Sequence, residues 1–268
     1  YSEKLRVEIG TDKNKFAFIQ AEDELAAMGM TIGANWNGAR AFTATSGPGV
    51  SLMSEFIGLA YFAEVPSVLF NVQRGGPSTG MPTRTQQSDI LCSAYASHGD
   101  TKHVLLIPSD PKECFDFAVE AFDLADRLQT PVIVLDLDLG MNDWSTKEFE
   151  WDDSTVYDKG KVLSKEDLDG IEKFGRYLDV DGDGIPYRTY PGTHPEKGAY
   201  FTRGTSHDEY AGYTEDGVKN AEMLSRLLKK FQTASSLVPA PVFNQEKNTS
   251  SIGVIYFGST DCSMQEAL

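Results

Sequence analysis

Residues 21–89 read AEDELAAMGMTIGANWNGARAFTATSGPGVSLMSEFIGLAYFAEVPSVLFNVQRGGPSTGMPTRTQQSD. An acidic helix start comes first, followed by a strand that ends in SGPG (residues 46–49) and by another that ends in RGG (residues 74–76). Chain reversals at the ends of successive strands are what a cofactor site in an open α/β sheet requires. This stretch therefore predicts the fold and the place of the site together.

Strands and helices alternate along the first half of the chain. Residues 66–72 (PSVLFNV) show little polar alternation, as in parallel strands that are covered on both faces. Asp110, followed by Pro111 and Glu113, is a strong helix start with Asp as the N-cap. Strict alternation predicts an α/β, doubly wound parallel sheet with right-handed crossovers. The expected strands are residues 15–20, 41–45, 66–72, 103–107 and 131–137, and the expected helices are 21–37, 51–62, 86–96 and 110–128.

The composition of the sequence changes after Gly140. Residues 141–248 are polar and aromatic, and we expect an irregular insert or linker region with one helix over 214–233. Residues 251–257 (SIGVIYF) predict a strand, and residues 263–268 the opening of a helix. We therefore expect an α/β domain at 1–140, the insert at 141–248, and the start of a second, truncated α/β domain at 249–268. The ends of the sequence, without an initial Met, suggest a piece of a longer polypeptide.

Composition narrows the class of protein. The 268 residues carry a net charge of −16, and such a surface repels phosphate backbones, so nucleic acid is not an expected partner. The sequence has no run of 18 apolar residues and no signal peptide at its start, so no membrane span is expected. Three widely spaced cysteines form no CxxC pair, which fits a reducing cytoplasm.

The acidic triplet Glu22-Asp23-Glu24 has two interpretations. Carboxylates at a helix N-terminus interact favourably with the helix dipole, and this is the usual reason for finding them there. Alternatively, one of the carboxylates faces a cofactor at the junction of strand and helix. The SGPG turn also has two interpretations. It is either an ordinary strand-to-helix turn or a place where a flat ring approaches the backbone. It contains no Walker-type phosphate loop.

Several segments together resemble one enzyme family. They are AEDELAAMGMTIGA (21–34), TATSGPG (43–49) and QRGGPSTGMPTRTQQSD (73–89), followed by HGD (98–100), QTPVIVLDLDLG (129–140) and GRYLDVDGDGIPYRTYPGT (175–193). In this order and spacing, they are similar to the alpha subunit of 2-oxoacid:ferredoxin oxidoreductases, most closely the 2-oxoglutarate type. The resemblance covers nearly the whole chain and implies the pyrimidine-binding fold of thiamine diphosphate enzymes.

The resemblance implies a cofactor that is shared between subunits. The alpha-type domain holds the aminopyrimidine ring of thiamine diphosphate, and the beta subunit holds the diphosphate, Mg²⁺ and a [4Fe-4S] cluster. Glu24 is the expected catalytic residue, because its carboxyl group would hydrogen-bond ring nitrogen N1′ and so help to activate the coenzyme. Glu22 is the rival assignment. The cofactor-binding residues expected beside Glu24 are Ser46, Gly47, Pro48 and Gly49.

The family's reaction is the oxidative decarboxylation of a 2-oxoacid. Coenzyme A receives the acyl group, ferredoxin receives the electrons, and the enzyme is an oligomer of alpha and beta subunits. The loop of residues 74–85 is expected near the active site, and an arginine in it suits bidentate binding of a carboxylate or of coenzyme A. The candidate substrate-binding residues are Arg74, Gly75, Gly76, Ser78, Thr79, Arg84 and His98.

Other polar residues have simpler interpretations. His103 is expected to be a structural hydrogen-bonding group, and Cys92 and Cys114 are expected to be small buried apolar residues. No metal site is expected in the chain, and the one alternative is a structural cation bound by an acidic loop. Acidic residues at calcium-loop positions would hold a structural cation, although the Glu required at the twelfth position is replaced by Tyr190. These acidic residues are Asp179, Asp181 and Asp183.

Part of the family's pattern lies outside the sequence. The strand end that carries a threonine near the cofactor is expected just before Tyr1, so we expect these 268 residues alone to be inactive. Two alternatives to a 2-oxoglutarate enzyme stay open. One is a pyruvate- or indolepyruvate-type relative, and the other is a non-catalytic scaffold subunit with the same fold.

Overall fold

The computed structural model describes residues 16–136, 143–243 and 251–268. Its described strands form one parallel sheet in the order β1-β2-β4-β3, as expected for an α/β fold. Val68 of β2 lies beside Phe42 of β1 on one side and Val132 of β4 on the other. The strands are β1 (Phe42–Thr45), β2 (Ser67–Val72), β3 (Val104–Leu106) and β4 (Pro131–Asp136).

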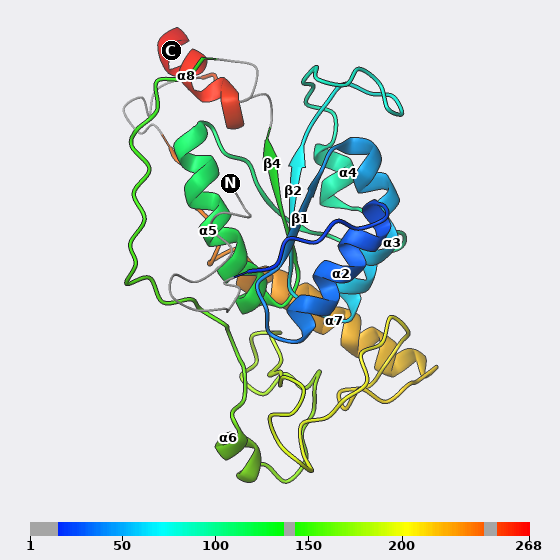
Figure 1. The fold of residues 1–268 in the computed structure, drawn as a ribbon. Helices are drawn as coiled ribbons and strands as arrows, with labels where there is room; N and C mark the ends of the chain where they lie inside the picture. The colour runs from blue at the N-terminus through cyan, green and yellow to red at the C-terminus, as the bar shows by residue number, and fades with distance from the viewer. Residues whose placement is uncertain (1–15, 137–142, 244–250) are drawn as a thin grey trace.

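Helices cover both faces of this sheet (Figure 1). Leu69 and Ile133 pack on one face against α2 (Glu24–Trp36) and α3 (Gly47–Phe62). The alternate strand positions, Val68, Val132 and Val134, pack on the other face against α5 (Pro111–Leu128). Because successive strand residues point to opposite faces, both faces are apolar, and each buried Val or Leu contributes about 1.5–3 kcal/mol. The result is the three-layer arrangement that alternation in the sequence predicts.

Side-chain caps fix where the helices begin. The N–H of Glu113 donates to Asp110 Oδ1 over 2.8 Å, and Pro111 occupies the first turn, so the expected start of α5 is confirmed. The N–H of Ala26 donates to Asp23 Oδ1 over 2.7 Å. Asp23 is therefore the N-cap of α2, and Glu24 is the first residue of that helix.

The segment of residues 143–243 is largely irregular, with a short helix α6 (Lys165–Asp169) and a long helix α7 (Gly217–Ala234). Helix α7 confirms the helix expected over 214–233. Its residues Phe231 and Ala234 join the apolar cluster on the α5 side of the sheet. Met223 and Leu227 pack with Tyr61 near the end of α3. In Figure 1, α7 crosses the end of the sheet opposite to the tips of the strand arrows.

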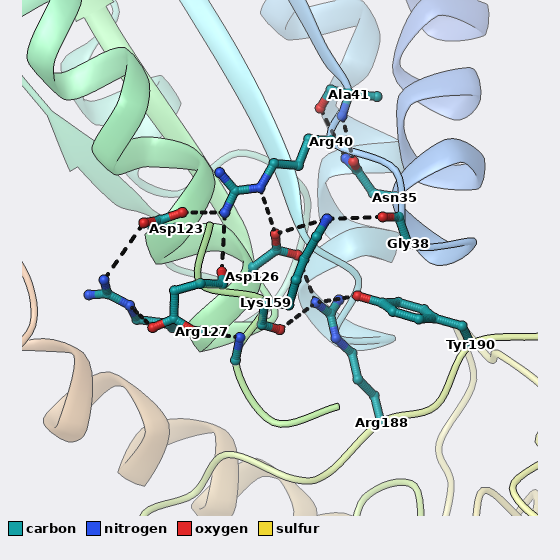
Figure 2. A network of polar contacts seen from close by, with 12 residues as sticks. Asn35, Gly38, Arg40, Ala41, Asp123, Asp126, Arg127, Lys159, Arg188 and Tyr190 are labelled. Atoms are coloured by element: carbon teal, nitrogen blue, oxygen red, sulfur yellow. Dashed lines mark hydrogen bonds and ion pairs between the residues drawn. The ribbon is translucent and has the colours of Figure 1, made fainter. Parts of the chain in front are cut away.

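Two buried polar networks fasten this segment to the sheet domain. In the first, Arg188 Nη2 donates to Asp126 Oδ1 over 2.7 Å, and Arg40 pairs with both Asp123 and Asp126 (Figure 2). Lys159 Nζ also donates to the carbonyl of Gly38 over 2.9 Å. These contacts join the α2–β1 connection and the end of α5 to the irregular segment, so the segment is held at the amino ends of the strands.

The second network surrounds Glu64, which follows α3. Arg226 forms a bidentate pair with the Glu64 carboxylate, and Lys230 Nζ donates to it over 2.9 Å. Arg176 Nη2 and the Tyr177 hydroxyl donate to the carbonyls of residues 64 and 63 over 2.7 and 3.2 Å. Burial alone raises the pKa of Glu64, but the charges of Arg226 and Lys230 outweigh it and lower the pKa to about 2.

Two expected strands are absent from the described residues. Residues 16–20 and 251–257 form no strand, and most of their side chains are exposed, with Ile255 at 95%. An apolar run becomes a strand only where another strand supplies hydrogen-bond partners, and neither run pairs with the described sheet. The helix opening expected at the end is confirmed by α8 (Asp261–Ala267), which follows the 3₁₀ turn Gly258–Thr260. Residues 1–15, 137–142 and 244–250, including parts of the expected first strand, domain boundary and linker, lie outside the described residues.

Several element boundaries also differ from expectation, and α2 begins at Glu24 and not at residue 21. Helix α3 begins at Gly47 and not at Ser51, so most of the predicted SGPG turn is the first turn of a helix. Helix α4 spans only Ile90–Ala94 of the eleven-residue helix expected there. None of the helices in the described ranges is long and apolar enough to cross a bilayer.

Candidate functional site

A cleft of about 560 Å³ lies at the carboxyl ends of β1, β2 and β4. The connection after β1 runs over one face of the sheet, whereas α5, which joins β3 to β4, runs over the other. Such a change of face opens a crevice outside the carboxyl ends of parallel strands, and ligands of α/β proteins bind there. The residues that line the cleft are Ala44, Thr45, Ser46, Val72, Gln73, Arg74, Thr83, Arg84, Thr85 and Asp136.

Glu24 and the first turn of α3 meet beside this cleft. A Cβ built on Gly49 would overlap Thr45 Oγ1 and would lie 3.1 Å from Glu24 Cγ. Gly49 therefore has to be a glycine because the side chains of Thr45 and Glu24 lie where its Cβ would be. Ser46 is the N-cap of α3 and lines the cleft, and Pro48 fits the first turn because no N–H is needed there.

The carboxylates of Glu24 and Glu22 are both exposed. Within the described ranges, neither makes a hydrogen bond or an ion pair. Only Glu24 is in contact range of Gly49, because it is the first residue of α2 while Glu22 precedes the N-cap. The structure therefore brings Glu24 together with residues 46–49, as expected.

The connection from β2 to α4 folds back on itself and carries the two arginines to the cleft. The N–H of Gly75 donates to the carbonyl of Arg84 over 2.7 Å, and the N–H of Met81 donates to the carbonyl of Gly75 over 2.8 Å. Arg74 is half-buried, and its Nε is buried without a hydrogen-bond partner in the described residues. Arg84 is exposed and donates to the carbonyl of Thr83 over 3.0 Å. Gly76, Ser78 and Thr79 lie on the exposed part of this loop and do not line the cleft.

His98 is not brought to the cleft. It is exposed in the connection between α4 and β3, just before β3 begins, and strands begin at the opposite end of a parallel sheet from the cleft. Its assignment to the substrate site stays a prediction that this position does not favour. His103 is buried, and its Nε2 lies 2.8 Å from the carbonyl of Ala96, which agrees with a structural role. Burial lowers the pKa of His103.

The cysteines differ from expectation, because Cys92 is exposed and Cys114 is half-buried. Partial burial raises the pKa of both thiols, that of Cys114 to about 12, so both remain protonated at neutral pH. Neither thiol is therefore an activated nucleophile.

The acidic loop is neutralised by lysine. Lys161 Nζ lies 2.6 Å from Asp181 Oδ2 and 2.9 Å from Asp183 Oδ2, and it also donates to the carbonyl of Ile185 over 3.0 Å. Lys229 pairs with Asp179 at 3.6 Å. No cluster of three or more potential ligands arranged for a metal ion exists among the described residues. Lysine ammonium groups therefore pair with all three acidic residues of the alternative cation site.

Sequence reasoning missed a buried polar cluster next to the cleft, in which Gln73 is the member that lines the cleft. Asn71, Gln73 and Asp89 are all buried, and the N–H of Asp89 donates to Gln73 Oε1 over 2.8 Å. Gln73 Nε2 in turn donates to the carbonyl of Asp136 over 3.2 Å. The available signal was two amides in and just after a buried strand, Asn71 and Gln73, where apolar residues are the rule.

Comparison with known proteins identifies the family. The family profile described as "Pyruvate flavodoxin/ferredoxin oxidoreductase, thiamine diP-bdg" (thiamine diphosphate-binding) matches residues 2–152, more than half of the chain. The chain belongs to this oxidoreductase family. The sequence resemblance is thereby confirmed, and the cleft beside Glu24 lies within the matched thiamine diphosphate-binding region.

Individual relatives of this oxidoreductase family agree. The chain is 39% identical over 272 residues to 2-oxoacid:ferredoxin oxidoreductase 2, subunit alpha, of Aeropyrum pernix, a match that covers 98% of this chain and 40% of that protein. It is 53% identical over 118 residues to the 2-oxoglutarate synthase subunit KorA of Methanothermobacter thermautotrophicus, covering 44% of this chain and 31% of the relative.

A solved structure extends the similarity to three dimensions. The 2-oxoglutarate:ferredoxin oxidoreductase of Magnetococcus marinus, determined with 2-oxoglutarate, coenzyme A and succinyl-CoA bound, superposes with a TM-score of 0.76 at 32% identity. The match covers 94% of this chain and 42% of that one. The chain thus spans between 31% and 42% of the length of these three relatives.

The side chains at the cleft fit the family's cofactor. Glu24 presents a carboxylate that is exposed and unpaired within the described residues, beside a wall built from Thr45 and Ser46. An aminopyrimidine ring offers a ring nitrogen that suits such a carboxyl group. Arg74 lines the same cleft, and a guanidinium is suited to binding an anionic group.

Proposed function

We propose that the full-length protein is the alpha subunit of a thiamine diphosphate-dependent 2-oxoacid:ferredoxin oxidoreductase. It oxidatively decarboxylates 2-oxoglutarate, or a related 2-oxoacid, to an acyl-CoA and CO₂, and passes the electrons to ferredoxin. The observation that carries the proposal is the position of Glu24, whose carboxylate has no partner among the described residues and stands beside the cleft in the region that matches the thiamine-binding profile. Support for the substrate comes from relatives named for 2-oxoglutarate.

Glu24 holds a proton at ring nitrogen N1′. Thiamine diphosphate supplies, when bound, the carbon nucleophile for attack on the 2-oxoacid and the electron sink for decarboxylation. Glu24 is placed at the first residue of a capped helix, so its backbone is fixed while its carboxyl group stays free. Thr45 and Ser46 form the wall against which the ring is oriented.

Arg74 and Arg84 bind the anionic groups of the substrates. A 2-oxoacid carries at least one carboxylate, and coenzyme A carries phosphates, and a guanidinium binds either group through paired donors. Both arginines line the cleft. Because Arg74 is partly buried and its Nε has no partner within the described chain, it is the stronger candidate for the carboxylate next to the reacting carbon.

A beta subunit completes the site. It holds the diphosphate, Mg²⁺ and the [4Fe-4S] cluster, which requires about four thiolates, whereas these 268 residues contain three separate cysteines. Free thiols without disulfide pairing also suit a reducing compartment, so the cytoplasm is the proposed location.

The test is 2-oxoacid- and coenzyme A-dependent reduction of a ferredoxin surrogate by the full-length protein co-expressed with its beta subunit. We expect Glu24→Gln to lose at least about 100-fold in kcat, the scale of a lost acid–base group, while the complex still assembles. Glu22→Gln is the matched control, because it removes a carboxylate two residues away without touching the cleft. Equal loss in both variants would refute the assignment of Glu24, and turnover with pyruvate alone would refute the 2-oxoglutarate assignment. No turnover by an assembled, cofactor-loaded complex would favour a scaffold subunit.

A further inference from the structure

Asp89 is a buried carboxylate that does not cap its own helix. It holds the N-cap position of α4 and is 8% exposed, yet its side chain makes no hydrogen bond to that helix. An Asp at an N-cap normally accepts from N–H groups of the helix that follows. The carboxylate of Asp89 is turned toward another element.

That element is the first turn of α3. Both carboxylate oxygens of Asp89 lie 3.0 Å from the position of a Cβ on Gly47, the first residue of α3. Ser46, the N-cap of α3, makes no side-chain cap bond, and the first turn of α3 contains no acidic residue. Asp89 therefore brings a negative charge from outside the helix to the positive end of the α3 dipole.

Hydrogen bonds hold Asp89 in this orientation. Asn71 Nδ2 donates to Asp89 Oδ2 over 3.2 Å, and Ser88 Oγ donates to Oδ1 over 2.9 Å. The backbone N–H of Asp89 donates to Gln73 Oε1 over 2.8 Å. Because residues 73 and 89 flank the arginine-bearing loop, this last bond closes the loop at its base.

We propose that Asp89 is a positioning residue for the reaction. It sets the first turn of α3 against Glu24 and closes the base of the loop that carries Arg74 and Arg84. The link to Glu24 is direct, because Gly49, two residues after Gly47, is in contact range of Glu24 Cγ. The catalytic meaning of this assignment rests on the proposed function, whereas the structural coupling does not.

The chemistry of the position favours Asp over its near relatives. Asn would place an NH₂ group among the donors of Asn71 and Ser88, so at least one acceptor would be lost. Glu would add a methylene at a point where the carboxylate already lies 3.0 Å from the Cβ position of Gly47. Both substitutions should therefore shift the first turn of α3.

Hydrogen exchange on the full-length subunit tests the coupling without any assay of activity. The reporters are the N–H groups of Gly49 and Val50, which donate to the carbonyl of Ser46, and those of Gly75 and Met81 in the loop. We expect Asp89→Asn, which keeps the backbone N–H that donates to Gln73, to speed exchange at Gly49 and Val50 by at least about tenfold. Gln73→Leu, which removes only the clamp at the base of the loop, should speed exchange at Gly75 and Met81 alone. Gln73→Leu provides a second test of the coupling if the Asp89→Asn variant does not fold.

Ser93→Ala is the matched control. Ser93 is fully buried and accepts from the same Asn71 amide over 3.2 Å, but it contacts neither Gly47 nor Gln73 in the described hydrogen bonds. Its exchange at the four reporters should match that of the unchanged protein. Equal acceleration in Ser93→Ala and Asp89→Asn would overturn the positioning role, because it would reveal only general loosening.

The second readout is kinetic and uses the assembled complex with the beta subunit. Asp89→Asn should lower kcat about tenfold and raise the concentration of thiamine diphosphate needed for half-maximal activity, while Ser93→Ala leaves both near the original values. Unchanged kinetics in Asp89→Asn would overturn the role in the reaction. If Asp89→Asn accelerates exchange but the protein without substitutions turns over no 2-oxoacid, the proposed function is refuted. The structural coupling is then still supported.

Discussion

The Lys230 ammonium donates to the Glu64 carboxylate over 2.9 Å, and neither side chain is more than 1% exposed. Glu64 holds a left-handed backbone (φ +56°) that an L residue adopts at some energetic cost. Its carboxylate also accepts from Arg226. One buried anion thus holds two cations of α7 at the end of α3 that is farthest from the cleft.

We expect Glu64→Gln to lower the free energy of unfolding by about 3–5 kcal/mol. Removing one partner of a buried ion pair leaves an uncompensated charge in a dry environment, and here Arg226 and Lys230 would both lose their counter-ion. Urea unfolding of the full-length subunit measures the effect. Glu222→Gln is the control, because it breaks the exposed pair with Lys219 at 3.2 Å and should cost less than about 1 kcal/mol. Similar losses in the two variants would contradict the prediction.

The same carboxylate predicts a loss of stability in acid. Because the pKa of Glu64 is lowered from 4.5 to about 2 in the folded state, its contribution is fully present above pH 4.5. It is lost as the pH falls from about 4.5 toward 2, and amounts to about 3 kcal/mol. Unfolding free energies measured across this range should fall steeply in the unchanged protein and less in Glu64→Gln. Parallel pH curves for the two proteins would show that other groups control acid unfolding.

The burial of His103 predicts a further loss of stability as the pH falls, and this loss begins at a higher pH than the loss from Glu64. Its Nε2 faces the carbonyl of Ala96, and its Nδ1 is buried without a partner among the described residues, so burial lowers the pKa of the ring. The unfolded chain therefore takes up a proton below about pH 6.5 that the folded chain resists, and stability declines as the pH falls through that value. Removing the titrating ring in His103→Gln should flatten the curve between pH 7 and 5.

Two glycine substitutions separate packing from helix propensity. Gly49→Ala should cost about 1–3 kcal/mol and weaken thiamine diphosphate binding, because the new Cβ meets Thr45 and Glu24. Gly33→Ala, in α2, has no atom within 4 Å of the new Cβ and should gain about 0.5–1 kcal/mol. Thermal melting and cofactor titration of the assembled complex measure both effects. Unimpaired cofactor binding in Gly49→Ala would contradict the close approach of Glu24 to this turn.

The features that could be predicted from the sequence are those whose cause is local. Asp110 accepts a hydrogen bond from the N–H of Glu113, three positions away, so residues 110–113 alone predict the start of α5. The parallel sheet follows from alternation alone, because buried strands and amphipathic helices have different periods. Glu24 and residues 46–49 were assigned to one site by resemblance; the structure places Glu24 beside Gly49, and the shared site stays a prediction.

The features that were missed depend on partners distant in the sequence. Glu64 meets Arg226 across 162 residues, and no local pattern marks a lone glutamate as buried. Asp89 lies within the helix expected over 86–96, but in the structure it precedes α4 and turns its carboxylate toward Gly47. Residues 251–257 have the composition of a strand but no neighbouring strand among the described residues. Composition sets what a segment is able to do, and tertiary contacts decide which option is used.

The two polar networks that fasten residues 143–243 lie at the amino ends of the strands, while the cleft lies at their carboxyl ends. A six-residue strand such as β2 separates the two ends by about 20 Å. Substitutions, insertions and deletions in residues 143–243 can therefore occur without altering the walls of the cleft.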